Sequence, residues 1–124
     1  VIVEELGISW LPHLLAVLDS AVGRSKNDQL SDGKLRPDYA GSAYRLPLAP
    51  SEYLRRQVRV TPLVATELLL PTLNLAPEML CFSSDYPHVE GTAQAVAICD
   101  RQLGDLDLSR RAAFYQGVAE LIGL

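Results

Sequence analysis

The chain has 124 residues, of which 48% are hydrophobic and 21% are charged, and its net charge is −4. These values fit a single globular domain, residues 1–124, that is large enough to bury a core. The basic residues form no cluster of the size that nucleic-acid binding needs, and no apolar stretch is long enough to span a membrane. Cys81 and Cys99 match no metal or redox spacing, so we expect buried free thiols and a cytoplasmic location.

The first residues predict a strand followed by a helix. Residues 1–3 are apolar and typical of the end of a buried strand, and Glu4 and Glu5 follow them directly. Because the chain begins within an apolar run and not at a methionine, we expect it to be a piece of a longer protein. Ser9 is a suitable N-cap for the helix, and Gly23 is a suitable end.

Residues 24–50 predict a long irregular loop, since they are rich in Ser, Asp, Gly, Lys and Pro. A loop of this length within a compact domain is usually functional or partly disordered. A lid over a binding site and a contact with another subunit both fit this segment, and the sequence does not decide between them.

The remaining predicted elements are a mixture of helices and strands. In chain order they are a helix over 52–57 capped by Ser51, a strand over 58–61, a helix over 63–70 ended by Pro71, a strand over 79–83, a helix from Thr92 to Leu103, and a last helix capped by Ser109. Three strands separated by helices predict right-handed crossovers and a parallel α/β sheet. A closed (β/α)8 barrel needs about 250 residues, so the chain is long enough for about half of one.

The polar residues after the last predicted strand are the first candidates for chemistry. In parallel α/β folds, reactions take place at the carboxyl ends of the strands. Asp85 and His88 lie three residues apart on a turn stiffened by Pro87, so both can reach one point and ligate a metal or exchange protons. The alternative is a turn in which Asp85 caps the next helix and His88 faces solvent.

Three groups of residues, in a fixed order, carry a resemblance to a known family. The groups are Glu5-Leu6-Gly7 with Ser9-Trp10-Leu11-Pro12 and Leu18-Asp19, then Pro50-Ser51-Glu52-Tyr53 with Arg55-Arg56-Gln57, and finally Ser84-Asp85-Tyr86-Pro87-His88. Together they resemble the carboxyl-terminal part of the amidohydrolase-related family. The resembling branch includes aminocarboxymuconate-semialdehyde decarboxylase-like enzymes and the hydrolases called amidohydrolase 2. The resemblance spans nearly the whole chain, but it covers only about the last three β/α units of such a barrel.

The resemblance implies a TIM-like (β/α)8 barrel, in which the strands that begin at Val1, Val58 and Met79 are the sixth, seventh and eighth. It implies that Asp85 is the last-strand aspartate, which binds or faces a catalytic divalent metal, usually zinc, and transfers protons. The parent protein would then be a metal-dependent hydrolase or decarboxylase that acts on a small organic acid or a cyclic amide-like substrate. Asp85 and His88 alone cannot complete a zinc site, so we expect the isolated chain to hold little or no zinc.

Three further residues are candidates through the same resemblance. At the sixth-strand position, where decarboxylase-like members have a histidine, this chain has Glu5, which can ligate a metal or face the substrate. Trp10 can line the pocket, although packing in the core is an equal alternative. Arg56 can bind a substrate carboxylate, although a structural salt bridge is the alternative.

A second hypothesis belongs to another class of function. Half of a barrel exposes unpaired strand edges and an apolar inner face, both of which favour association. The chain would then be catalytically silent and would act, if at all, as a homo-oligomer.

Overall fold

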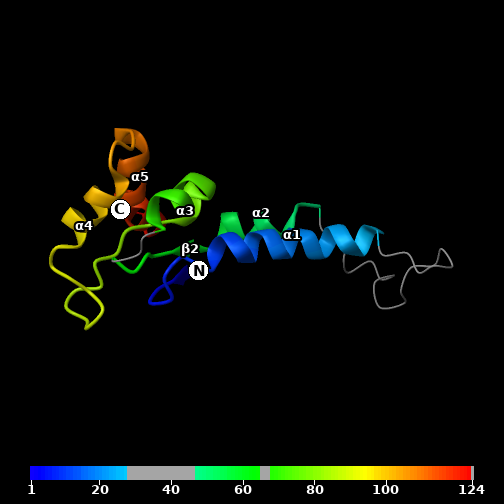
Figure 1. The fold of residues 1–124 in the computed structure, drawn as a ribbon, viewed down its shortest axis with the longest axis horizontal. Coiled ribbons are helices and arrows are strands. Elements are labelled where there is room, and N and C mark those ends of the chain that lie inside the picture. Colours follow the sequence, from blue (N-terminus) through cyan, green and yellow to red (C-terminus); the bar gives the residue numbers. More distant parts are fainter. Residues whose placement is uncertain (28–46, 65–67, 124) are drawn as a thin grey trace.

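The computed structural model describes residues 1–27, 47–64 and 68–123, and in these ranges helices surround a small parallel sheet (Figure 1). The elements in chain order are β1 (Ile2–Val3), α1 (Leu11–Asn27), α2 (Pro50–Gln57), β2 (Arg59–Val60), α3 (Leu69–Leu75), the 3-10 helix η3 (Pro77–Met79), α4 (Ala95–Leu103) and α5 (Leu108–Leu121). Among the described helices, none combines the length and the apolar character that a bilayer crossing requires.

The sheet is parallel, as the order of the predicted elements indicated. β1 pairs with β2 in the register Ile2 to Arg59 and Val3 to Val60. On its other side, Val60 forms a parallel bridge with Leu80, and the Cys81 N–H donates to the Val60 carbonyl at 3.1 Å. The three predicted strand positions therefore lie side by side in one direction, which confirms the α/β class.

The third predicted strand, 79–83, is reduced to a single bridge for two local reasons. Met79 belongs to η3, which takes the beginning of the segment out of extended conformation. The Phe82 N–H donates to the carbonyl of Phe114 in α5, at 3.0 Å, so a helix lies where a further strand would pair. Gly117 allows this approach, because a Cβ there would lie only 3.3 Å from the Cβ of Cys81.

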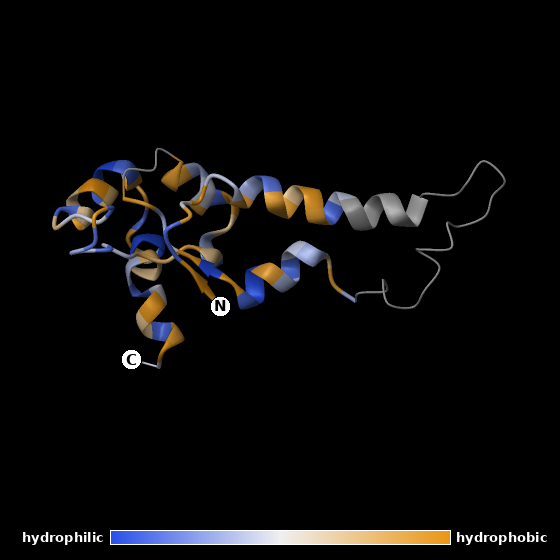
Figure 2. Ribbon diagram, turned by 90° about the horizontal axis from the view of Figure 1, so that it is seen from below, coloured by the Kyte–Doolittle hydropathy of each residue, from blue (hydrophilic) through white to orange (hydrophobic). Residues whose placement is uncertain are grey.

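α1 and α2 contact each other and form an arm that projects from the rest of the molecule (Figure 1, Figure 2). The expected helix end at Gly23 is wrong, since α1 continues to Asn27. A single glycine within a helix costs only about 1 kcal/mol relative to alanine, and the residues that follow it can sustain the helix. The predicted loop 24–50 is thus shortened at both ends, and its middle part, 28–46, lies outside the described residues.

Ser51 has a different role from the predicted one. α2 begins at Pro50, because proline has a backbone φ suited to the first helical position, so Ser51 lies within the helix. Its N–H and its Oγ donate to the two carboxylate oxygens of Asp19 in α1, at 2.9 and 2.6 Å. These two hydrogen bonds lower the pKa of Asp19, and they fasten the beginning of α2 to α1.

The helices after the sheet begin later than the sequence predicted, or are capped differently. Residues 65–67 of the predicted helix 63–70 lie outside the described residues, and α3 begins at Leu69 and continues past Pro71. Pro71 lies in its first turn, where a backbone N–H has no partner within the helix, so the missing N–H of proline costs no hydrogen bond. Thr92 accepts a hydrogen bond from the Gln94 N–H at 3.1 Å, a local turn that delays α4 to Ala95. The cap of α5 is Asp107, which accepts from the Arg110 N–H at 3.0 Å, and Ser109 only supports it.

The core lies between the sheet and the helices. Both cysteines are buried free thiols, as predicted, and burial raises the pKa of Cys81 and raises that of Cys99 to about 11. These thiols are therefore unreactive packing residues. The buried cluster comprises Ile8, Leu11, Leu15, Val60, Leu69, Leu73, Ala76, Met79, Leu80, Cys99, Leu103 and Phe114.

Candidate metal and proton-transfer site

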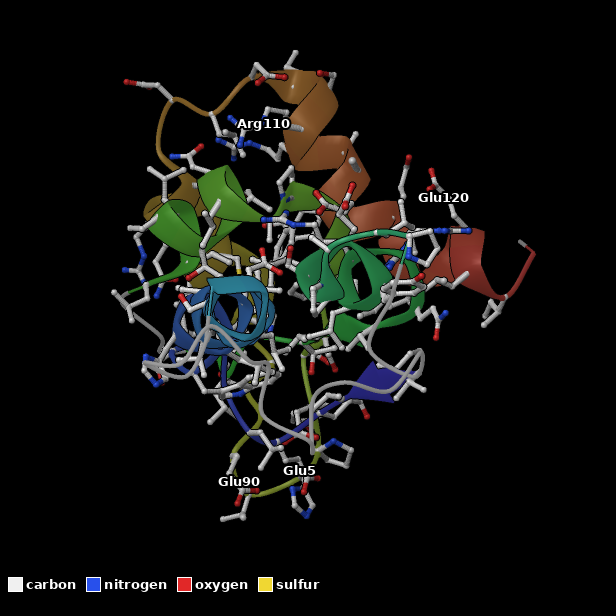
Figure 3. The ribbon with its side chains drawn as sticks, turned by 90° about the vertical axis from the view of Figure 1, so that its right-hand side faces the viewer. Glu5, Glu90, Arg110 and Glu120 are labelled. Atoms are coloured by element: carbon white, nitrogen blue, oxygen red, sulfur yellow. The ribbon has the colours of Figure 1, made fainter. Side chains whose placement is uncertain are left out.

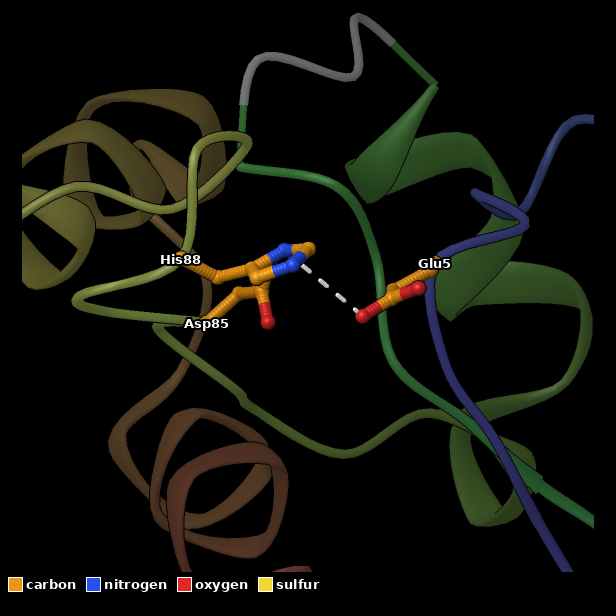
Figure 4. A group of neighbouring side chains, drawn as sticks. All are labelled: Glu5, Asp85 and His88. Carbon is orange, nitrogen blue, oxygen red and sulfur yellow. Dashed lines mark ion pairs between the residues drawn. The ribbon is translucent and has the colours of Figure 1, made fainter.

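Two segments distant in sequence meet at the carboxyl end of the sheet. β1 leads into Glu4 and Glu5, and the bridge at Leu80 leads through Ser83 into the turn that begins at Asp85. Because these segments run parallel, their carboxyl ends lie at the same edge. Figure 4 shows Glu5 on one segment pointing towards Asp85 and His88 on the other, and ligand atoms of the three residues lie within 4.8 Å of one another.

Both carboxylates of this group come from residues with unusual backbone conformation. Glu5 has a φ of 61° and Asp85 a φ of 51°, in the left-handed region that non-glycine residues seldom adopt. Such conformations are retained where the surrounding structure imposes them, and they are common at functional sites. In both segments, the residue with the left-handed backbone is also the residue that contributes its carboxylate to the group.

The loop that carries Asp85 and His88 is closed by its own hydrogen bonds. The His88 N–H donates to the Asp85 carbonyl at 2.8 Å, and the Gly91 N–H donates to the His88 carbonyl at 3.0 Å. The Thr92 N–H donates across the neck of the loop to the Ser84 carbonyl at 3.2 Å. The N-cap of α4 is Gln94, so Asp85 is not the helix cap that the alternative interpretation required.

Three carboxylates surround the imidazole of His88. Its Nδ1 atom lies 2.6 Å from Glu90 Oε2, 3.4 Å from Asp85 Oδ2 and 3.7 Å from Glu5 Oε1. The negative charges of Glu90, Asp85 and Glu5, in this order, raise the pKa of His88 above its ordinary value of 6.5. We call Glu5, Asp85, His88 and Glu90 the strand-end cluster. The sequence did not single out Glu90; its position two residues after His88 in the same turn was the available signal.

One oxygen of the strand-end cluster has no hydrogen-bond partner. Asp85 Oδ2 is buried and accepts no hydrogen bond of good geometry from the described residues; its contact with His88 Nδ1 at 3.4 Å is an ion pair, and the side chain as a whole is 28% exposed. An open hollow of about 520 Å³ lies beside it, lined by Glu5, Ser83, Ser84, Asp85, Tyr86, Pro87 and His88. A cavity of about 10 Å³, the size of one water molecule, adjoins this hollow, and its lining also includes Glu4, Thr61 and Glu90.

The donor set fits a divalent metal. Zinc takes carboxylate oxygen and imidazole nitrogen ligands, and catalytic zinc sites commonly have three protein ligands. Glu5, Asp85 and His88 offer two carboxylates and one imidazole, and the unpartnered Asp85 Oδ2 is an available lone pair. Without a metal, the same groups can accept, hold and release a proton.

Two predicted site residues lie elsewhere. Trp10 is partly buried against the core, and its indole N–H donates to the Gly7 carbonyl at 2.9 Å, so it packs beneath the turn that follows β1. Arg56 is exposed in the last turn of α2, directly before the amino end of β2. Neither residue lines the hollows at the strand-end cluster.

Comparison with known proteins found no matching family model, curated protein or solved structure. The assignment to the amidohydrolase-related family therefore stays a prediction that depends on the sequence pattern alone.

Proposed function

We propose that the chain is the carboxyl-terminal portion, about three β/α units, of a (β/α)8-barrel enzyme related to the amidohydrolases. The enzyme would be a metal-dependent hydrolase or decarboxylase acting on a small organic substrate. The observation that supports this proposal most directly is the convergence of Glu5, Asp85 and His88 from two distant segments at the carboxyl ends of parallel strands. In α/β barrels this edge is where catalytic side chains gather.

Each residue has a chemical role in this proposal. Asp85, with its unpartnered oxygen, accepts a proton from water or substrate. Where His88 does not ligate the metal, its raised pKa favours holding such a proton, which it can return to a leaving group. Glu5 adds a third donor from the opposite segment. A divalent metal, when bound by these groups, supplies Lewis acidity that polarises a carbonyl and lowers the pKa of water.

The lining of the hollow also bears on the substrate. The residues that line it include the carboxylates of Glu5 and Asp85, and no lysine or arginine is among them. Unless a metal offsets these negative charges, a carboxylate-bearing substrate would be repelled. The proposed decarboxylation of an organic acid at this site therefore requires the metal more strictly than hydrolysis of a neutral amide does.

Zinc titration of the purified chain tests the proposal. We expect a weak, saturable site of one zinc per chain, with little metal retained on purification because two of the three donor residues, Glu5 and His88, are exposed. Glu5→Gln and Asp85→Asn should each weaken binding by about tenfold or more, since each removes a charged ligand. Glu120→Gln is the matched control, because Glu120 lies away from the cluster (Figure 3). Equal affinity in all variants would remove the metal from the proposal.

A further inference from the structure

Gly91 lies against the backbone of Asp85 and not against a side chain. A Cβ atom at position 91 would lie 2.1 Å from the Asp85 carbonyl oxygen, 2.3 Å from the Asp85 carbonyl carbon and 2.6 Å from the Tyr86 nitrogen. All three distances are far inside van der Waals contact, and the atoms belong to a peptide group that no rotamer change can move. Any other residue at position 91 would force the loop open.

The peptide that Gly91 contacts is the one that sets the geometry of the strand-end cluster. Its carbonyl oxygen accepts the His88 N–H at 2.8 Å, and it follows the left-handed backbone of Asp85. Gly91 in turn donates its own N–H to the His88 carbonyl at 3.0 Å. The glycine is therefore joined to both functional residues through the main chain, although it does not line the hollow itself.

We propose that Gly91 is the positioning residue of this site: its missing side chain lets the loop close on the Asp85 peptide, and this closure directs the Asp85 carboxylate and the His88 imidazole to one point. The catalytic meaning of this role rests on the proposed function. The geometric claim does not, because it concerns the conformation of Asp85 alone.

Gly104 provides a control. Its φ is positive, 53°, at the end of α4, whereas Gly91 is not among the glycines with a positive φ, and a Cβ at position 104 would meet nothing within 4 Å. Gly104→Ala strains the backbone locally without approaching the strand-end cluster. Any effect that Gly91→Ala and Gly104→Ala share is a general cost of losing a glycine, and an effect that only Gly91→Ala has belongs to the site.

The experiment uses the whole 124-residue chain with two measurements. Backbone chemical shifts of Asp85, which report its left-handed conformation, should change in Gly91→Ala and stay unchanged in Gly104→Ala. Cobalt(II), titrated as a spectroscopic probe, should bind Gly91→Ala about tenfold or more weakly than the wild type, and Gly104→Ala equally well. Unchanged Asp85 shifts in Gly91→Ala would overturn the proposal, and so would unchanged cobalt affinity in the presence of altered shifts.

The two measurements distinguish failure of the proposed metal site from failure of the role proposed for Gly91. If cobalt does not bind the wild type, the metal site of the proposed function fails, and the Asp85 shifts still decide the role of Gly91. If Gly91→Ala does not fold, amide exchange in the wild type decides it instead. The amides of His88 and Gly91, which donate within the closed loop, should then exchange slowly, and rapid exchange of both would contradict the closed loop.

Discussion

The charges on the helices and the charges at the strand ends follow opposite rules. Between the helices, two carboxylates each meet a guanidinium: Arg55 lies 2.6 Å from Glu78, and Arg111 lies 2.7 Å from Asp100. At the strand ends, three carboxylates surround one imidazole, and the described residues provide them with no lysine or arginine. Figure 3 shows Glu5 and Glu90 at one end of the molecule and Arg110, which lies on α5 next to Arg111, at the other.

The difference separates charges that stabilise the fold from charges that the fold has to hold in place. Arg111 donates to Asp100 and to the Gly104 carbonyl, and Tyr115 donates to the same Asp100 at 2.9 Å, so these bonds join α4 and α5, although the buried Arg111 Nε has no hydrogen-bond partner among the described residues. The strand-end cluster instead has an excess of negative charge, since three carboxylates face one imidazole. Features that oppose stability and gather at one point are typical of functional sites.

The largest expected effects, on turnover and on stability, come from replacing one aspartate in each region by asparagine. In the proposed parent enzyme, Asp85→Asn should lower turnover about 10²- to 10⁴-fold, because it removes the proposed proton acceptor. It should leave the melting temperature unchanged or raise it, because it removes one of several like charges. The measurements are hydrolysis of small amides, release of CO2 from small carboxylic acids, and thermal unfolding.

Asp100→Asn is the reciprocal variant. It weakens the bonds to Arg111 and Tyr115, so the free energy of unfolding should fall by about 1–2 kcal/mol while turnover stays near that of the wild type. The contrast between the two regions would fail if Asp100→Asn lost turnover and Asp85→Asn lost stability.

A smaller effect is expected from pH. The carboxylates stabilise the protonated form of His88, so their contribution to folding is fully present below pH 6.5 and is lost as the pH rises through the raised pKa of the folded state. A metal needs the same imidazole deprotonated, so zinc affinity should rise over this interval by up to about tenfold per pH unit. Zinc titrations at several pH values measure this slope. In His88→Gln, zinc affinity should depend less steeply on pH. An equally steep dependence in this variant would show that the proton displaced by zinc comes from another group.

The smallest effect is expected at Arg56. Since it is exposed and does not line the hollow, Arg56→Ala should change the free energy of unfolding by less than about 0.5 kcal/mol and leave turnover unchanged. Arg55→Ala, next to it, should cost more stability, because Arg55 contacts both Glu78 and the Leu75 carbonyl. A rise in KM in Arg56→Ala but not in Arg55→Ala would instead support the predicted contact between Arg56 and a substrate carboxylate.

The sequence predicted the parts of the fold that depend on local pattern. Apolar runs identified the strand positions, and the rule that parallel strands react at their carboxyl ends selected Asp85 and His88. Glu5 became a candidate only through the family resemblance. Helix boundaries were less predictable, because Gly23 and Pro71 are tolerated where neighbouring residues or position in the first turn reduce their cost.

Two members of the site could not be found from the sequence for a different reason. Glu90 reaches His88 only because the loop folds back on itself, and Gly91 matters only because a peptide group lies against its Cα atom. Such contacts depend on the tertiary path of the loop and leave no periodic signal.

The two hydrogen bonds between Asp19 and Ser51 have a consequence for how this protein can vary. They join Asp19, which precedes the 28–46 segment, to Ser51, which follows it. The distance between these two residues is therefore fixed, whatever number of residues lies between them. In general, doubling the length of chain between two fixed points costs only about 0.6 kcal/mol in closure entropy. Insertions and deletions should therefore accumulate between these two residues, and the arm is the natural place to attach a fluorescent or affinity domain without disturbing the sheet.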